Sequence, residues 1–188
     1  VGIDRMGPSV MDDNYIHFTK DILSDDLPDI EGIEILINNA GVQDSGRDID
    51  INLKGTIRIT EKYGIRQGIR SILFIASASG STGSEFPEYA ASKGGVIAYM
   101  KNTALRIAVY GATCNSLSPG GVITRLNQHI LEDECLLNAV LDETMLHKWA
   151  STEEIAEWAY FLTVVNRSMT AQDVLVDNGE AAKFNFIW

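Results

Sequence analysis

The sequence is poor in the residues that build disulfide frameworks and metal sites. Its 188 residues include two cysteines, three histidines and four prolines. Cys114 and Cys135 lack the paired spacing of a disulfide framework or a zinc site, so we expect both to be buried thiols. The histidines are scattered and no carboxylate cluster supplies a metal geometry. We therefore predict no metal in catalysis.

Long apolar runs and an excess of positive charge are also lacking. No apolar stretch approaches the roughly 18 residues that a membrane span needs, and the first residues do not form a signal peptide. Fifteen basic and 26 acidic side chains give a net charge of −11, which disfavours binding to nucleic acid or to an anionic membrane. We expect a cytoplasmic protein that binds neither.

What the sequence does contain is an alternation of strand and helix patterns. With 45% hydrophobic residues it has enough apolar material for the core of one domain, residues 1–188. Strands followed by helices predict an α/β fold with a parallel sheet. The expected strands are 15–19, 33–37, 71–76, 113–118 and 173–176; the expected helices are 49–64, 88–110, 131–145 and 152–164, the last opened by a capping box at 151–154.

A tyrosine and a lysine lie four residues apart in Tyr89-Ala90-Ala91-Ser92-Lys93, with Ser77 twelve residues upstream. Residues four apart share a helix face, so the Lys93 ammonium is expected beside the Tyr89 ring, where it lowers the phenol pKa. Moving that pKa from about 10 to about 7 takes about 4 kcal/mol, and a cationic nicotinamide ring nearby would add to the effect. Ser77 could hold a substrate oxygen that exchanges a proton with Tyr89. The three side chains suit carbonyl reduction or alcohol oxidation.

Further motifs surround this trio in a fixed order. They are Asn38-Asn39-Ala40-Gly41, Asn52-Leu53-Lys54-Gly55, Ile75-Ala76-Ser77-Ala78-Ser79-Gly80, the YAASK run, and Asn115-Ser116-Leu117-Ser118-Pro119-Gly120. With them, the chain resembles the short-chain dehydrogenase/reductase family over about residues 1–179. The resemblance implies a Rossmann-like, doubly wound parallel sheet in three α/β/α layers. It also implies a small-molecule substrate, an NAD(P) cofactor and a homo-oligomer, either a tetramer or a dimer.

The same resemblance assigns roles to particular residues. Ser77, Tyr89 and Lys93 would be the catalytic triad, and Asn52 would complete a tetrad by holding a water in a proton relay through Lys93. Asp21 resembles the acidic residue beside the adenine, and Thr124 would lie near the nicotinamide carboxamide. The remaining positions implied in cofactor binding are Asn38, Ala40, Gly41, Tyr89, Lys93, Pro119, Gly120 and Val122.

The chain departs from the family at its start. The family opens with a strand and a glycine-rich turn that cradles the pyrophosphate at a helix N-terminus, and no glycine here is placed to do that. The segment 1–4 reads instead as the end of the second strand, where Asp4 would bond the adenosine ribose. An acidic residue there favours NAD over NADP, although Arg5 lies beside it. About 30 residues of a βαβ unit have thus been cut off, left out of the numbering or lost in evolution.

Glycines and spacing give three further expectations. Asn38 and Asn52 are closer than is usual in the family, and 43–47 reads as a loop in place of a helix. Gly94 and Gly95 lie inside the Tyr89 helix at a cost of about 1 kcal/mol each, which indicates close packing against the sheet or cofactor, or plain helix–sheet packing. The polar stretch 80–84 is expected either to border the substrate or to be a surface turn.

The substrate is the least determined property. A small polar alcohol or ketone, such as a sugar or a hydroxy acid, is the first choice. Reduction of a 3-oxoacyl group on acyl carrier protein is the alternative, although that acidic partner would need a basic patch on a chain of net charge −11. A catalytically silent nucleotide-binding scaffold is a third reading, suggested only by the missing glycine-rich turn.

Overall fold

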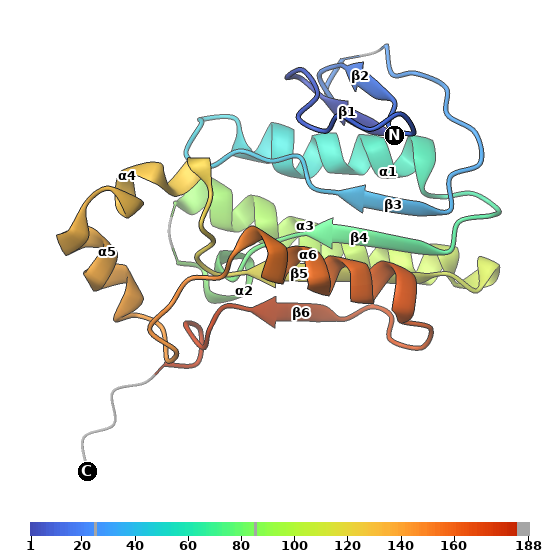
Figure 1. Ribbon diagram of the computed structural model, residues 1–188. Helices are drawn as coiled ribbons and strands as arrows, with labels where there is room; N and C mark the ends of the chain where they lie inside the picture. The colour runs from blue at the N-terminus through green and yellow to red at the C-terminus, as the bar shows by residue number, and fades with distance from the viewer. Residues whose placement is uncertain (25, 85, 184–188) are drawn as a thin grey trace.

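The computed structural model describes residues 1–24, 26–84 and 86–183, in which strands and helices alternate (Figure 1). The strands are β1 (Gly2–Asp4), β2 (His17–Thr19), β3 (Ile35–Asn38), β4 (Ser71–Ile75), β5 (Thr113–Pro119) and β6 (Asp173–Val176). The α-helices are α1 (Thr56–Tyr63), α2 (Ser79–Thr82), α3 (Pro87–Ile107), α4 (Gln128–Leu131), α5 (Glu134–Leu141) and α6 (Thr152–Tyr160). Two segments are π-helical: η1 (Ile49–Gly55), which precedes α1, and η4 (Phe161–Val165), which follows α6. Two are 3-10 helical: η2 (Ala108–Tyr110), which follows α3, and η3 (Arg125–Asn127), which precedes α4.

All strand pairs are parallel, as the sequence predicted. Strands β3, β4, β5 and β6 form one sheet in that order, while β1 pairs with β2 in a separate two-stranded sheet. Within the described residues, β1 and β3 each have a strand partner on one edge only. Figure 1 shows the small sheet on the β3 side of the larger one, near α1.

Helices cover both faces of the larger sheet. Ile72 and Phe74 of β4 pack against Val96, Met100 and other buried residues of α3. Leu73, the residue between them, packs on the opposite face against Leu162 of η4 and partly buried residues of α6. Because successive strand residues point to opposite faces, a strand covered on both sides is a continuous apolar run. The predicted three-layer α/β/α architecture is confirmed.

Several local expectations are wrong. The expected helix 131–145 is shorter, since α5 covers Glu134–Leu141 and Leu131 is the last residue of the separate helix α4. The Asp133 carboxylate accepts a hydrogen bond from the Leu136 amide (3.0 Å) and so begins α5. The stretch 80–84 was expected either to border the substrate or to be a surface turn, and its first three residues lie in the short helix α2. Cys114 is buried as predicted, but Cys135 on α5 is exposed. The capping box of α6 is confirmed, with Ser151 and Glu154 bonding each other's backbone amides.

No helix of the described ranges is long and apolar enough to cross a membrane. The apolar tail 181–188, which the sequence suggested could pack against a neighbouring subunit, lies from residue 184 onward outside the described residues.

Candidate active site

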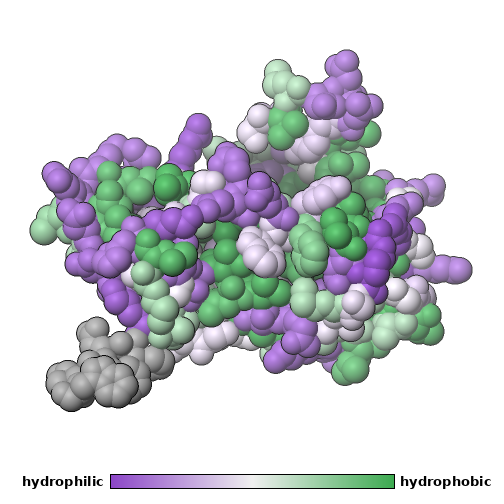
Figure 2. Space-filling view, turned by 60° about the horizontal axis from the view of Figure 1, so that its bottom comes forward, coloured by the Kyte–Doolittle hydropathy of each residue, from purple (hydrophilic) through white to green (hydrophobic). Residues whose placement is uncertain are grey.

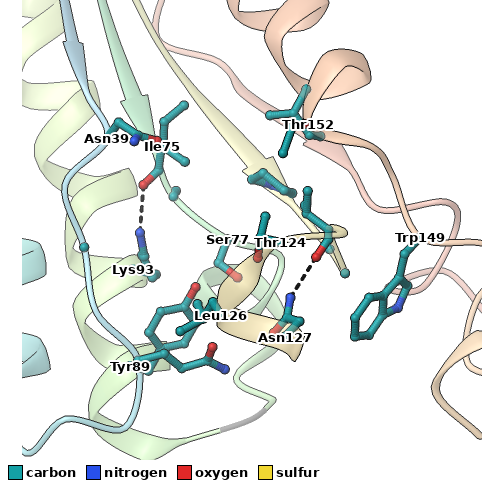
Figure 3. A pocket seen from close by; sticks show the side chains of 18 of the residues that line it. Asn39, Ile75, Ser77, Tyr89, Lys93, Thr124, Leu126, Asn127, Trp149 and Thr152 are labelled. Atoms are coloured by element: carbon teal, nitrogen blue, oxygen red, sulfur yellow. Dashed lines mark hydrogen bonds between the residues drawn. The ribbon is translucent and has the colours of Figure 1, made fainter. Parts of the chain in front are cut away.

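A cavity of about 1070 Å³ opens at the carboxyl ends of the central strands. Its wall contains Gly41 after β3, Ser77 after β4 and Gly120 after β5. In open α/β sheets, ligands bind outside the carboxyl ends of the strands. The topology alone therefore makes this cavity the candidate site. Figure 3 shows Ser77 at its wall together with Tyr89 and Lys93, which both come from α3.

Helix α3 supplies Tyr89 and Lys93. It begins at Pro87, whose fixed backbone and missing amide hydrogen suit the first helical turn. One helical turn then places the Lys93 Nζ 5.6 Å from the centroid of the Tyr89 ring. The expected pairing of an ammonium with the phenol ring is confirmed by this geometry. A cation over an aromatic face is attracted by the ring and stabilises negative charge on it.

Lys93 is buried, with 6% of its surface exposed. Its Nζ donates a hydrogen bond of 2.9 Å to the Ile75 carbonyl at the end of β4. Burial disfavours the charged form and lowers the pKa of Lys93 from 10.5 to about 8. Lys93 is therefore expected to give up its proton more readily than an exposed lysine.

Ser77 lies two residues beyond β4 and is 7% exposed. Its Oγ accepts a hydrogen bond from the Ser79 amide (3.2 Å) and donates one to the Ser79 hydroxyl (3.2 Å). These two contacts orient the Ser77 hydroxyl at the start of α2. Ser79 is itself buried, so it holds Ser77 from the protein side of the wall.

Glycines bring the Ser77 turn against the Lys93 helix. A Cβ at Gly80 would lie 2.8 Å from the Lys93 carbonyl carbon and 2.9 Å from the Gly94 amide nitrogen. A Cβ at Gly94 would lie 3.1 Å from the Gly80 oxygen, and one at Gly95 would lie 2.7 Å from Leu53. The two glycines inside α3 therefore permit close packing against α2 and η1, whereas the sequence led us to expect packing against the sheet or the cofactor.

Replacing Gly80 by alanine is expected to lower the free energy of unfolding by about 1–3 kcal/mol, because backbone atoms must move to admit the methyl group. Urea unfolding of both proteins measures this. Gly7→Ala is the control, since nothing lies within 4 Å of a Cβ at that position. An unchanged midpoint for Gly80→Ala would show that the α2–α3 contact is looser than it is in the structure.

Asn52 lies in the π-helical segment η1 and is 1% exposed. Its side chain bonds both backbone groups of Val42, accepting from the amide (2.8 Å) and donating to the carbonyl (2.8 Å), and it also donates to the Ser92 hydroxyl (3.0 Å). Its Oδ1 would be 3.2 Å, and the Lys93 Nζ 3.5 Å, from a Cβ built at Gly41. Asn52 is thus one layer behind the wall, close to Gly41.

The structure brings most, but not all, of the sequence-predicted residues to the cavity. The wall includes Ser77, Tyr89, Lys93, Gly41, Pro119, Gly120, Val122 and Thr124. Asn38, Ala40, Asn52, Asp4 and Asp21 are not on it. Asn38 donates instead to the Thr60 hydroxyl of α1 (3.1 Å). Asp4 and Asp21 accept hydrogen bonds from the nearby amides of Met6 and Leu23 (2.8 Å each) in the small sheet and the turn after it.

Asn127 and Trp149 are among the wall residues that the sequence motifs did not predict. Asn127 donates to the Val122 carbonyl (2.9 Å) and so fixes the segment after β5 (Figure 3). Trp149 lies against Gly121, where a Cβ would be 2.1 Å from the indole nitrogen. Neither belongs to a motif. The only signal was a glycine doublet at 120–121, which permits such a close approach.

The wall fits one half of a nicotinamide dinucleotide. Lys93, Tyr89 and Thr124 offer hydrogen-bonding groups beside the apolar Ile37 and Val122 around one cavity. The pyrophosphate end fits poorly, because the described chain has no glycine-rich turn leading from a strand into a helix N-terminus. A Rossmann-like sheet with a cavity at the carboxyl ends of its strands is typical of dinucleotide-dependent oxidoreductases.

Comparisons with known proteins agree with that class. A family model described as enoyl-(acyl carrier protein) reductase matches residues 19–180. The D-beta-hydroxybutyrate dehydrogenase of Rhizobium meliloti is 30% identical over 178 residues, covering 81% of this chain and 69% of the relative. A 3-oxoacyl-[acyl-carrier-protein] reductase of Thermotoga maritima is 30% identical over 163 residues, covering 78% and 65%. The chain therefore belongs to the short-chain dehydrogenase/reductase family.

A solved structure with a similar fold supports the assignment of the fold. A short-chain dehydrogenase family protein from Francisella tularensis superposes with a TM-score of 0.83 at 21% identity, covering 96% of this chain and 87% of that one. The chain spans about two thirds of the length of the two curated relatives it matches.

Proposed function

We propose that residues 1–188 act as one oxidoreductase domain that interconverts an alcohol and a carbonyl by hydride transfer with NAD(P). The observation that carries the proposal is the convergence of Ser77, Tyr89 and Lys93 on one cavity at the strand ends. The substrate is a small polar alcohol or ketone, such as a sugar or a hydroxy acid. Family membership supports the reaction class, and the site supports the mechanism.

The bound nicotinamide dinucleotide supplies or accepts the hydride. In carbonyl reduction, the Tyr89 hydroxyl gives its proton to the substrate oxygen, and in alcohol oxidation it takes that proton back. The Ser77 hydroxyl binds the same oxygen and orients it. The Lys93 ammonium stabilises the phenolate at 5.6 Å from the ring centre. Asn52, behind Gly41, holds a water that returns protons through Lys93.

The reaction is tested by following NADH and NADPH oxidation with a panel of ketones, and the reduction of both oxidised cofactors with the matching alcohols. Turnover that depends on the substrate supports the proposal. Cofactor binding without any turnover across the panel would favour the catalytically silent scaffold.

The cofactor is proposed to be NAD, with Asp4 bonding the free ribose diol and repelling a 2′-phosphate. Asp4 ends β1, at the carboxyl edge of the small sheet. Asp4→Ser is expected to raise the ratio of kcat/KM for NADP to that for NAD by about tenfold, equal to about 1.4 kcal/mol. Asp12→Ser is the control. An unchanged ratio would count against this placement of the adenosine ribose.

The alternative substrate is a 3-oxoacyl group on acyl carrier protein, which relatives with that printed name support. A net charge of −11 opposes it, because the carrier is acidic as well.

We further propose a homo-oligomer, a dimer or a tetramer. Leu105 in the last turn of α3 and Val109 in η2 are 79% and 80% exposed, and a subunit contact would cover them.

A further inference from the structure

Acidic side chains dominate the charge of the cavity wall. Asp44, Glu143 and Glu180 are among its lining residues. The Glu180 carboxylate lies directly against the strand end, since a Cβ at Gly120 would be 2.6 Å from its Oε2. Asp44 comes from the loop after β3, and Glu143 from the turn after α5. Three separate segments thus bring negative charge to one cavity.

Positive charge on the wall is scarce. Among the described lining residues, the basic side chains are Lys93 and His129, and none is an arginine. Lys93 is buried and donates to the Ile75 carbonyl beside Tyr89, so it belongs to the reacting end of the cavity. His129 is exposed. Asp44 and Glu143 are exposed as well, so each of these charges changes the affinity for a charged ligand by at most about fivefold. One imidazole therefore does not outweigh the acidic side chains of the wall.

The outer part of the wall is largely apolar. Phe86 precedes α3, Leu126 and Ile130 lie on η3 and α4, and Val140 lies on α5. Trp149 adds an indole ring. Figure 2 shows hydrophobic side chains gathered near the middle of one face of the molecule with hydrophilic ones around them. Such a wall binds an apolar chain by removing its surface from water.

We propose that the cavity selects an uncharged alcohol or ketone that carries an apolar chain, and discriminates against the corresponding carboxylate. The inference rests on the proposed function and revises its substrate class, because it favours neutral alcohols or ketones with an apolar chain over both hydroxy acids and sugars. The reacting oxygen lies at Ser77 and Tyr89, and the chain extends toward Leu126 and Trp149. The net charge of −11 acts in the same direction by lowering the local concentration of anions.

A matched pair of ligands tests the proposal: methyl 3-hydroxyhexanoate and the 3-hydroxyhexanoate anion. Binding is measured by ligand-detected NMR and by calorimetry, and turnover by NADH formation. We expect the ester to bind at least about tenfold more tightly, with a similar ratio in kcat/KM. In Asp44→Asn/Glu143→Gln, that ratio falls at least about threefold, because the anion is repelled less. Glu157→Gln, on α6 outside this cavity, leaves it unchanged.

The outcomes separate this inference from the function on which it rests. Equal or tighter binding of the anion, or no binding of either ligand, overturns the charge selection. Turnover that favours the anion overturns it as well, while the oxidoreductase function stands. Preferential binding of the ester without turnover by either cofactor supports the selectivity and contradicts the proposed reaction.

Discussion

Tyr89→Phe is expected to reduce kcat for carbonyl reduction by about 10²- to 10⁴-fold, the range that positioned proton transfer contributes. The substitution removes one oxygen and keeps the ring that lies 5.6 Å from the Lys93 Nζ. Packing is therefore retained, and KM is expected to change by less than about threefold. The measurement is NADH oxidation with the best ketone of the panel, at saturating substrate.

Tyr160→Phe is the matched control, because this tyrosine lies on α6, is 60% exposed and does not line the cavity. It should retain full activity. If Tyr89→Phe also turned over at the wild-type rate across the panel, no proton would pass through the phenol. The proposed mechanism would then be wrong, whatever the cofactor.

Much of the fold could be predicted from the sequence, because a strand buried on both faces must be apolar throughout. The apolar run at β4 was visible for that reason, and the 21-residue helix α3 was visible from the helical spacing of its buried residues. Elements without a buried pattern were not. The break between α4 and α5 depends on one capping carboxylate at Asp133, which a helical periodicity does not reveal.

The same contrast holds for the candidate site. Tyr89 and Lys93 could be placed together because helix geometry relates residues four apart. Asn38 could not be placed, since the sequence does not tell which way a side chain at a strand end points; it points to Thr60 of α1. Trp149 and the acidic wall come from segments whose meeting depends on tertiary packing. Local patterns hold no information about such contacts.

Lys93→Met is expected to abolish turnover and yet to stabilise the fold at pH 7. Burial lowers the pKa of Lys93 from 10.5 to about 8, a difference worth about 3 kcal/mol at 1.36 kcal/mol per pKa unit. Below pH 8 both folded and unfolded states are protonated, so the folded state bears this full cost. A methionine of similar shape removes it, but leaves the Ile75 carbonyl without its ammonium donor at a cost of about 1–2 kcal/mol. The net gain is about 1–2 kcal/mol.

The gain must vanish with rising pH. Between pH 8 and 10.5 the folded protein loses the Lys93 proton before the unfolded chain does, so the wild type becomes relatively more stable. Urea unfolding is therefore measured at pH 7 and at pH 10.5. At pH 7 the free energy of unfolding of Lys93→Met should exceed that of the wild type, and at pH 10.5 it should be equal or lower. Lys101→Met, exposed on the same helix, should differ from wild type by less than about 0.5 kcal/mol at both. A loss of stability at pH 7 would mean that the ammonium supports the fold. The predicted gain would mean that the site keeps a buried charge at the expense of stability, as expected of a group retained for chemistry.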